Sequence, residues 1–306
     1  MLDIKLKDLR YLVALADARH FGRAAQRCCV SQPTLSAQLK KLEASLGVQL
    51  IERRPSNVAL TEAGRQIVER ARLIIAACEE VGALARSHRD PLAGTLRVAL
   101  LPTIGPYLLP HVARPIQRAL PRVMLHLHEY RTAPMLEKLR AGELDLGILA
   151  LPVELEGLEA IELYSEPFVA ALPERHRLAR RERIHASDLA GEPLLLLEEG
   201  HCLRDQALAL CSQAGAREQQ NFRATSLETL RQMVAAGAGI TLLPQSATEG
   251  AYGGARGVVV VPFAKPAPTR QVGAVWRKTT ARKAVLDALC AVVAERGAQA
   301  VCVKSR

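Results

Sequence analysis

The sequence predicts a multidomain α/β protein, and three observations support that prediction. The first 60 residues contain three helical apolar patterns followed by two strand-like segments. An apolar repeat with heptad spacing then runs from residue 61 to about residue 88. Beyond it, apolar runs of strand length alternate with helical stretches, which is typical of parallel α/β sheets. The 306 residues are enough for separate domains, and we expect them over residues 1–60, 61–90 and 91–306.

The third predicted helix has two contrasting faces. It follows Ser31, whose side chain can cap it, and stops at Gly47. One face is a leucine stripe that would pack on a core. The opposite face and its flanks carry short, polar and basic side chains, among them Pro33, Thr34, Ser36 and Lys40. Such a surface suits a helix that enters the DNA major groove, and a plain three-helix unit with a solvated basic face is the alternative.

Two short strands after this helix would form a wing. They span residues 48–54 and 57–60, on either side of Pro55-Ser56, and carry Arg53 and Arg54. Together with the helices before them, they predict a winged helix-turn-helix over residues 1–60.

The positive charge is concentrated in this N-terminal part. The net charge of +10 comes from 41 basic and 31 acidic side chains, and residues 1–60 hold ten basic against five acidic ones. Half of the excess therefore lies in about a fifth of the chain. Aromatic residues make up only 3%, which argues against readers of single strands, because these stack bases on exposed rings. Duplex DNA, bound through its phosphates, stays open as a partner.

A long helix is predicted to follow the wing and to reach about residue 88. Its apolar seam steps by four and three residues through Ile67, Ala71, Ile74, Cys78, Val81 and Ala85. A helix of this length extends about 40 Å, too far to be buried in a small domain. We expect it to dimerise with a second copy, and a single packing helix is the alternative.

A hinge at residues 90–94 separates this helix from a different pattern. Predicted strands cover residues 95–101, 124–129, 144–151, 194–197, 240–243, 258–261 and 272–276. Predicted helices cover residues 107–119, 134–141, 204–214, 226–237 and 281–296. About 210 residues of this kind suit two small α/β lobes with a ligand-binding cleft between them.

Several enzyme signatures are missing from the sequence. It contains no Gly-rich phosphate loop, no GxGxxG after a strand, no HExxH and no GxSxG. His126, His128 and Glu129 share a predicted strand and could bind a metal, but structural sites need about four ligands and no cysteine lies nearby in the sequence. We therefore interpret them as surface polar residues and expect no metal and no cofactor.

The N-terminus lacks an apolar signal region, and no apolar run reaches the length of a membrane span. We therefore expect a cytoplasmic protein without membrane contact. Thiols stay reduced in that compartment, so most of the seven cysteines would be reduced residues of the core.

One cysteine pair stands apart from the others. Cys202 follows a Gly-His turn at the start of a predicted helix, where the helix dipole, free backbone N–H groups and Arg204 would favour the thiolate. Cys211 lies nine residues on, about 13 Å away along a helix, whereas a disulfide needs about 7 Å or less between Cα atoms. A bridge would require the helix to melt, which makes the pair a potential redox switch. Two inert cysteines are the alternative.

Several segments together resemble the LysR-type transcriptional regulators. The DNA-binding part of that resemblance lies in residues 21–25, 30–36, 42–43 and 60–64. Three further segments resemble the hydrogen peroxide sensors of the family, namely residues 102–110, the GHCLRDQ motif at 200–206, and residues 222–230. The resemblance covers residues 6 to 280.

This resemblance implies a periplasmic-binding-protein-like regulatory domain and a role for each matching residue. Cys202 would react with peroxide and Cys211 would resolve it. Thr103 and Thr132 would hold peroxide and water, His201, Arg204 and Asp205 would orient the site, and Arg270 would face the reduced cysteine. In the DNA-binding module, Gln32, Pro33, Thr34 and Ser36 match the start of the recognition helix, and Lys40 and Arg53 would contact phosphates.

The resemblance also implies partners. They are duplex promoter DNA, hydrogen peroxide as the signal, further copies of the chain in a homodimer or homotetramer, RNA polymerase, and a reductant of glutaredoxin or thioredoxin type. The expected protein is a regulator and not an enzyme. One alternative is a regulator of the same family that binds a small metabolite in the interlobe cleft, and another is a thiol peroxidase.

Overall fold

The computed structural model describes residues 4–53, 58–87, 90–213, 215, 217–248 and 256–301. The chain divides into two compact units. The first comprises residues 1–89 with 140–143, and the second comprises residues 90–139 with 144–306.

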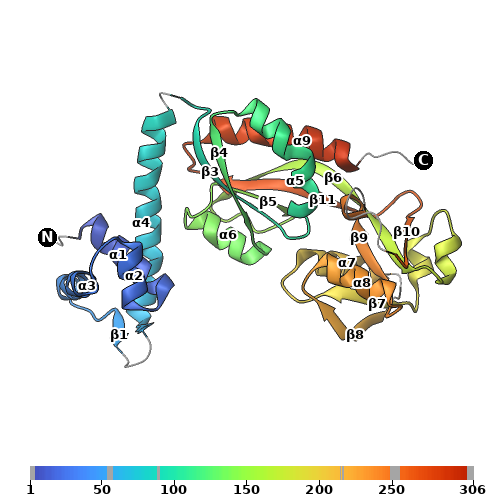
Figure 1. Ribbon diagram of the computed structural model, residues 1–306, viewed down its shortest axis with the longest axis horizontal. Helices are drawn as coiled ribbons and strands as arrows, with labels where there is room; N and C mark the ends of the chain where they lie inside the picture. Colours follow the sequence, from blue (N-terminus) through green and yellow to red (C-terminus); the bar gives the residue numbers. More distant parts are fainter. Residues whose placement is uncertain are drawn as a thin grey trace. The chain divides into compact units, whose positions relative to one another are not determined.

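The N-terminal unit is built from helices and one small hairpin (Figure 1). Leucines at helical spacing bury one face of each long helix, as in α3, where Leu35, Leu39 and Leu42 lie in the core. The predicted order of three helices and a hairpin is confirmed. The elements are α1 (Leu6–Ala18), α2 (Phe21–Arg27), α3 (Gln32–Leu46), the antiparallel strands β1 (Ile51–Arg53) and β2 (Val58–Leu60), and α4 (Glu62–Ser87).

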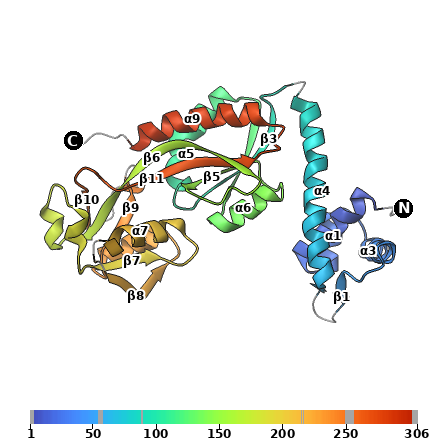
Figure 2. The same ribbon diagram turned by 180° about the vertical axis from the view of Figure 1, so that it is seen from behind.

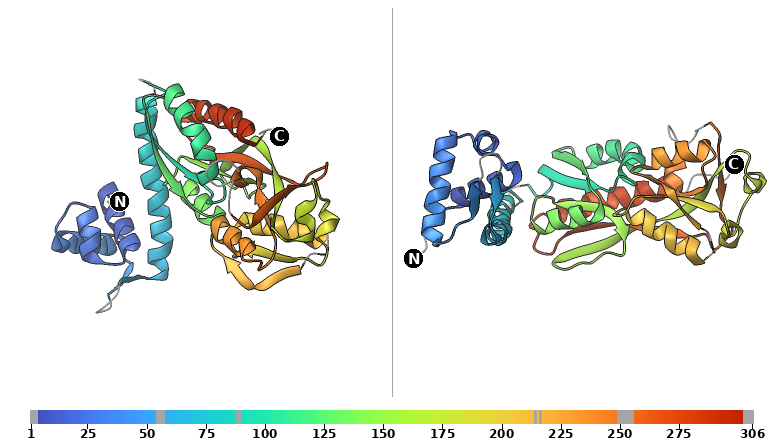
Figure 3. Two further views of the ribbon diagram at one scale, coloured as in Figure 1. Left: turned by 45° about the vertical axis from the view of Figure 1, so that its right-hand side comes forward. Right: turned by 90° about the horizontal axis from the view of Figure 1, so that it is seen from below.

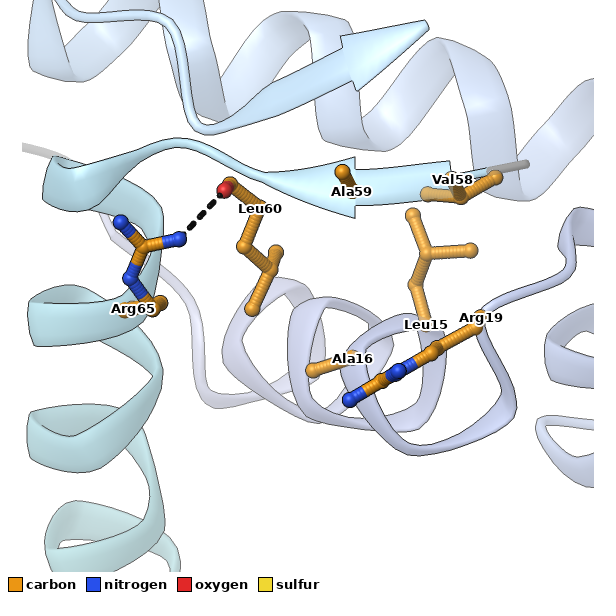
Figure 4. A pocket seen from close by; sticks show the side chains of 7 residues that line it. All are labelled: Leu15, Ala16, Arg19, Val58, Ala59, Leu60 and Arg65. Carbon is orange, nitrogen blue, oxygen red and sulfur yellow. Dashed lines mark hydrogen bonds between the residues drawn. The ribbon is translucent and has the colours of Figure 1, made fainter. Parts of the chain in front are cut away.

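The hairpin is fixed to the helices around it. The Glu43 carboxylate of α3 accepts hydrogen bonds from the backbone N–H groups of Leu50 (2.8 Å) and Ile51 (3.1 Å). From α4, Arg65 Nη1 donates to the Leu60 carbonyl at 3.0 Å. Figure 4 shows the small pocket that lies between β2, α1 and Arg65, lined by Leu15, Ala16, Arg19 and the three residues of β2. The wing is thus held in place by α3 and α4.

The long helix α4 buries only part of its apolar seam. Ala71 is buried and Ile67 half-buried, whereas Ile74 is 48% and Val81 69% exposed. A soluble helix seldom leaves a row of large apolar side chains in water. Ile74 and Val81 are therefore exposed apolar side chains of the seam that a paired helix would cover.

The second unit contains a mixed β-sheet (Figures 1 and 2). Strand β3 pairs in parallel with β4 and β5, but β6 runs antiparallel to β9, β10 and β11, and β11 also runs antiparallel to β5. The prediction of parallel α/β sheets holds for only some of the strands. β3, β4, β5 and β6 run in one direction, whereas β9, β10 and β11 run in the opposite direction. These strands are β3 (Gly94–Leu100), β4 (Val123–Glu129), β5 (Leu146–Leu151), β6 (Leu158–Pro173), β9 (Thr241–Pro244), β10 (Val258–Pro262) and β11 (Thr269–Arg277).

Two hydrophobic cores define two lobes within this unit, which confirms the predicted two-lobed α/β fold. Lobe 1 packs α5 (Gly105–Ala119), α6 (Thr132–Arg140) and α9 (Lys283–Val301) on the sheet. Lobe 2 packs α7 (Cys202–Gln213) and α8 (Leu227–Ala235) around the parallel strands β7 (Pro193–Leu197) and β8 (Arg217–Ala224), with short 3₁₀ turns at Arg177–Arg180, Ala186–Leu189 and Gln245–Thr248.

Strand β6 belongs to both lobes. Its first half places Leu158 and Tyr164 in the core of lobe 1, and its second half places Phe168 and Leu172 in the core of lobe 2. Figure 3 shows the same path from two further sides. Strands β6 and β11 lie side by side where the chain passes between the lobes. A residue on either strand can therefore contact groups of both lobes.

None of the described helices is long and apolar enough to cross a membrane.

Candidate functional site

Cys202 begins helix α7 and faces a pocket formed by both lobes. The turn before it contains Gly200 at φ = +88°, a conformation that favours glycine. The pocket measures about 450 Å³. Lobe 1 supplies Thr132 and the residues from Ala150 to Glu154, and lobe 2 supplies Gly200, Cys202, Asp205 and Gln206. Cys202 is a free cysteine and only partly buried, so a small solute in this pocket can reach its sulfur.

Charged side chains hold the loop that leads to Cys202. Arg131, from lobe 1, forms an ion pair with Glu198 and donates from Nη1 to the Glu199 carbonyl at 3.2 Å. Arg223 of β8 approaches the Glu199 carboxylate to 3.4 Å. The loop between β7 and α7 is therefore tied to the opposite lobe as well as to its own.

The environment of the Cys202 thiol pulls its pKa in two directions. Burial raises the pKa, and Asp205 adds to the increase, while Arg270, the Thr132 hydroxyl and the Leu203 backbone N–H favour the thiolate. The net result is a pKa above that of an ordinary thiol. The expectation that the start of the helix would leave a lowered pKa was therefore wrong for this conformation, because burial outweighs the groups that stabilise the anion.

Arg204 does not supply the cation that the sequence suggested. Its Nη1 donates to Glu218 at 2.8 Å and to the Leu197 carbonyl at 3.3 Å, and the residue is buried. Two residues along a helix are a rotation of about 200°, so Arg204 and Cys202 point to different sides of α7. Arg204 therefore anchors α7 to β7 and β8, and the arginine that acts on the thiol is Arg270 of β11.

Arg270 is completely enclosed by its partners. Its Nε donates to Glu166 Oε2 at 2.8 Å, and Nη2 lies 2.6 Å from the same oxygen. The other contacts reach the loop before α5, with Nη2 at 2.9 Å from the Thr103 carbonyl and Nη1 at 3.3 Å from its hydroxyl. Thr103 thus contacts the arginine of the site, and its hydroxyl lies beside the guanidinium.

The remaining predicted residues lie around the thiol in different roles. The Thr132 hydroxyl favours the Cys202 thiolate, and it is buried without a hydrogen-bond partner among the described residues. His201 is buried, and burial together with Arg131 lowers its pKa, so its ring is neutral at neutral pH. Its Nε2 has no partner within the described part of the chain. Asp205 is exposed and lines the pocket.

Cys211 lies on the same helix as Cys202. Helix α7 runs without a break from Cys202 to Gln213, and nine helical residues separate two Cα atoms by about 13 Å. The side chain of Cys211 lies outside the described residues. The intact helix keeps the two cysteines further apart than a disulfide allows.

Sequence reasoning missed two charged residues that the structure brings to the site. Glu166 holds Arg270, but it lies on β6, a strand that was not predicted. Arg131 directly precedes Thr132 and holds the loop before Cys202. An acidic residue inside a long apolar strand is costly to bury unless it is paired, and that signal could have singled out Glu166.

Helix α3 presents the predicted DNA-binding residues to solvent. Ser31 caps the helix, with its Oγ accepting from the Thr34 backbone N–H at 3.3 Å. Ser36 is half-buried, and the other predicted residues on the helix are exposed, namely Gln32, Pro33, Thr34 and Lys40. The side chain of Arg53, predicted on the wing, lies outside the described residues. The structure therefore leaves the outer face of α3 free to enter a groove.

The other predictions on cysteines and histidines can be compared with the structure. Among the described cysteine side chains, Cys290 is buried, Cys28 and Cys202 are half-buried and pack against hydrophobic cores, and Cys29 and Cys78 are exposed. All five are free thiols. Cys302 lies outside the described residues. Among the described residues there is no group of three or more potential metal ligands, and β4 leaves His126 and His128 exposed.

Comparison with known proteins assigns the chain to a family. Residues 6–65 match the bacterial regulatory helix-turn-helix proteins of the LysR family, and residues 89–298 match the LysR substrate binding domain. The chain therefore belongs to the LysR family of transcriptional regulators, and it is a DNA-binding regulator and not an enzyme.

Within that family, OxyR proteins are among those that the chain resembles. The chain is 48% identical over 274 residues to the DNA-binding transcriptional dual regulator OxyR of Escherichia coli K12, covering 90% of each chain. A full-length OxyR variant from Pseudomonas aeruginosa is similar in structure, with a TM-score of 0.78, 40% identity, and coverage of 95% of this chain and 94% of the other. A hydrogen peroxide-bound OxyR variant from Corynebacterium glutamicum has a TM-score of 0.68 and 34% identity, covering 97% and 94%.

Proposed function

We propose that this regulator senses hydrogen peroxide through Cys202 and stores the signal as a reversible disulfide with Cys211. The observation that carries the proposal is the placement of Cys202. It is a free thiol at the start of α7, it opens onto a pocket, and it lies within the field of the buried Arg270. The similar proteins include OxyR regulators and a hydrogen peroxide-bound form of one of them, which supports the same signal.

The first chemical step is an oxidation of the thiol. A lone pair of the Cys202 sulfur attacks one oxygen of hydrogen peroxide and the O–O bond breaks. The departing hydroxide takes the thiol proton to form water, and a sulfenic acid remains on Cys202. Thr103 and Thr132 would hold the peroxide and water, His201 and Asp205 would orient the site, and Arg270 would stabilise both the thiolate and the departing hydroxide.

The second step closes the disulfide. The Cys211 sulfur attacks the sulfur of the sulfenic acid, the S–O bond breaks, and the leaving hydroxide takes the Cys211 proton to form a second water. Because the intact helix separates the two residues by about 13 Å, α7 has to unwind between them. The loop at Glu198 and Glu199 and the anchor at Arg204 must rearrange with it, which changes how lobe 2 packs.

Three segments of the chain would together convert this change into a change in transcription. Residues 1–60 would bind promoter DNA, with Gln32, Pro33, Thr34 and Ser36 facing the groove and Lys40 and Arg53 meeting phosphates. Residues 61–90 would pair with a second copy, and residues 91–306 would sense. The regulator would bind a long promoter site as a homotetramer and contact RNA polymerase. A reductant of glutaredoxin or thioredoxin type would reduce the disulfide again, and the protein would be cytoplasmic.

The decisive experiment maps disulfides in the reduced full-length protein after about one equivalent of hydrogen peroxide. We expect a peptide that links Cys202 to Cys211, detected by mass spectrometry, and its loss after dithiothreitol. The exposed Cys29 and Cys78 are internal controls, because exposure alone would oxidise them first. If Cys202 and Cys211 remain unlinked while small metabolites change DNA binding, the regulator senses a ligand in the cleft instead.

A further inference from the structure

The buried carboxylate of Glu166 has no role in the chemistry described so far. It is fully buried on β6, directly opposite Arg270 on β11. Both of its oxygens are used, with Oε2 accepting from Arg270 and Oε1 accepting from the backbone N–H of Ser246 at 2.9 Å. Ser246 belongs to lobe 2, and Arg270 in turn contacts Thr103 of lobe 1. Glu166 is therefore fixed between the two lobes.

Counting donors shows what this arrangement leaves free on Arg270. A guanidinium has five N–H groups. Glu166 Oε2 accepts from Nε and forms an ion pair with Nη2 at 2.6 Å, the Thr103 carbonyl accepts from Nη2, and the Thr103 hydroxyl accepts from Nη1. These contacts engage all three nitrogens and fix the plane of the fork. Among the described residues, the second Nη1 hydrogen has no acceptor, so it is left for a group that enters the site.

We infer that Glu166 is a positioning residue for the peroxide reaction, because it fixes Arg270 with its remaining Nη1 hydrogen available to a peroxide beside Cys202. This inference rests on the proposed function of Cys202. A paired arginine with a fixed orientation is preorganised, so it need not rearrange when charge develops on the departing oxygen. Without the carboxylate, a buried and unpaired guanidinium would turn towards other acceptors or water.

The groups around the Cys202 thiol allow the positioning of Arg270 by Glu166 to be distinguished from a direct effect of the Glu166 charge on the thiol. The charged groups that act on Cys202 are Arg270 from β11 and Asp205 from its own helix, and α6 contributes the neutral Thr132 hydroxyl. The hydroxyl of Tyr164, also on β6, faces the Glu166–Arg270 pair, and burial and Glu166 raise its pKa, so it stays neutral. Glu166 contacts Arg270 directly and is not among the groups that shift the pKa of Cys202, so its effect on the thiol is expected to pass through Arg270.

The test compares Glu166→Gln and Glu166→Asp with Glu162→Gln. Glu162 is an exposed carboxylate on the same strand, so it is a matched control for the loss of one negative charge. The reduced full-length proteins are mixed with hydrogen peroxide at several pH values, and the loss of the Cys202 thiol is followed by quenching and mass spectrometry. Alkylation of Cys202 with iodoacetamide over the same pH range reports the thiolate directly.

We expect Glu166→Gln to slow the second-order oxidation of Cys202 roughly 10- to 100-fold and to move both pH profiles to higher pH. Glu166→Asp, which keeps the charge but is shorter, should recover part of the rate, and Glu162→Gln should match the wild type. Adding Glu166→Gln to Arg270→Gln should cause no further loss, because the two residues act as one unit.

Three outcomes would overturn the inference. Glu166→Gln could react at the wild-type rate, or it could slow the reaction without moving the pH profiles. Alternatively, adding Glu166→Gln to Arg270→Gln could slow the oxidation by the same factor as it does in the wild-type protein. If Glu166→Gln does not fold, Glu166→Asp decides by the same pH profiles. A wild-type protein whose Cys202 is inert to peroxide would refute the proposed function itself, whereas a reactive wild type with an equally reactive Glu166→Gln refutes only the role of Glu166.

Discussion

Two cysteines of the regulatory unit lie on helices, Cys290 fully buried and Cys202 partly buried, and their surroundings differ. Cys290 lies in the middle of α9, within the apolar core of lobe 1. Burial and Asp287 raise its pKa to about 12, and only the exposed Lys283 acts in the opposite direction. Cys202 begins α7 at the edge of a pocket, where Arg270, Thr132 and a backbone N–H all oppose the effect of burial.

The contrast separates burial from reactivity. A thiol reacts with peroxide as the thiolate, and burial by itself suppresses that form at both positions. What distinguishes Cys202 is a set of fixed polar groups from three elements, together with a pocket that admits a small molecule. A sensor cysteine in this fold therefore depends on its neighbours in space rather than on its position at a helix end.

Replacing Cys202 and Cys290 one at a time should give the largest difference in the response to peroxide. Cys202→Ser should abolish the Cys202–Cys211 disulfide and the peroxide response of a reporter promoter, while DNA binding of the untreated protein persists. Cys290→Ala should keep the full response, at a cost of about 1 kcal/mol in stability for the small cavity. A Cys202→Ser protein that still responds to peroxide would contradict the assignment of Cys202 as the sensor cysteine.

Alkylation as a function of pH should rank the two cysteines. With a pKa of about 12, Cys290 holds about one part in a thousand of thiolate near pH 9, and the core also shields it. The pKa of Cys202 is raised as well, but Arg270, Thr132 and the Leu203 backbone N–H oppose the increase, so its labelling should begin at lower pH than that of Cys290. Peptide mapping of the native protein after a short pulse of iodoacetamide measures the order, and earlier labelling of Cys290 would contradict it.

Thr132→Val should have a smaller effect, because it removes one hydroxyl and keeps the shape of the side chain. The hydroxyl favours the Cys202 thiolate, so its loss should raise the pKa of Cys202 and slow oxidation by roughly 5- to 10-fold at neutral pH. Stopped-flow mixing with hydrogen peroxide gives the rate. Labelling of Cys290 should be unchanged in the same protein, which serves as the internal control.

Asp205→Asn should give the smallest change, and in the opposite direction. The Asp205 carboxylate raises the pKa of Cys202, so neutralising it should lower that pKa and speed oxidation. Since Asp205 is exposed and screened by salt, we expect about a twofold gain that shrinks at high ionic strength. A slower reaction would show that Asp205 orients the site rather than only opposing the charge.

The N-terminal unit and the alternating elements of the regulatory unit could be predicted because their patterns are local. Leu35, Leu39 and Leu42 repeat at the helical period, and Ser31 precedes them as a cap. Strand β6 escaped prediction because glutamates and Pro167 interrupt its apolar residues. Burial of Glu166 depends on Arg270, which is distant in sequence and adjacent only across the sheet.

Only the part of the site that depends on local sequence could be predicted. The start of α7 identified Cys202, and the resemblance supplied Arg270, but spacing in the sequence suggested Arg204 as the cation. Helical rotation turns Arg204 away to Glu218. Local spacing thus located the thiol, whereas the groups that set its chemistry come from β11 and α6, which only the folded sheet brings together.

The path of the chain through the two lobes also has a consequence for biosynthesis. Lobe 2 lies between the two segments that build lobe 1, because β11 and α9 return to the core begun by β3, α5 and β5. Leu286, Leu289 and Val293 of α9 complete that core, and a side chain at Gly297 would collide with the Tyr164 ring. On the ribosome, lobe 2 can close first, while lobe 1 must wait for its last helix. A chain shortened before α9 would expose an open apolar face and aggregate.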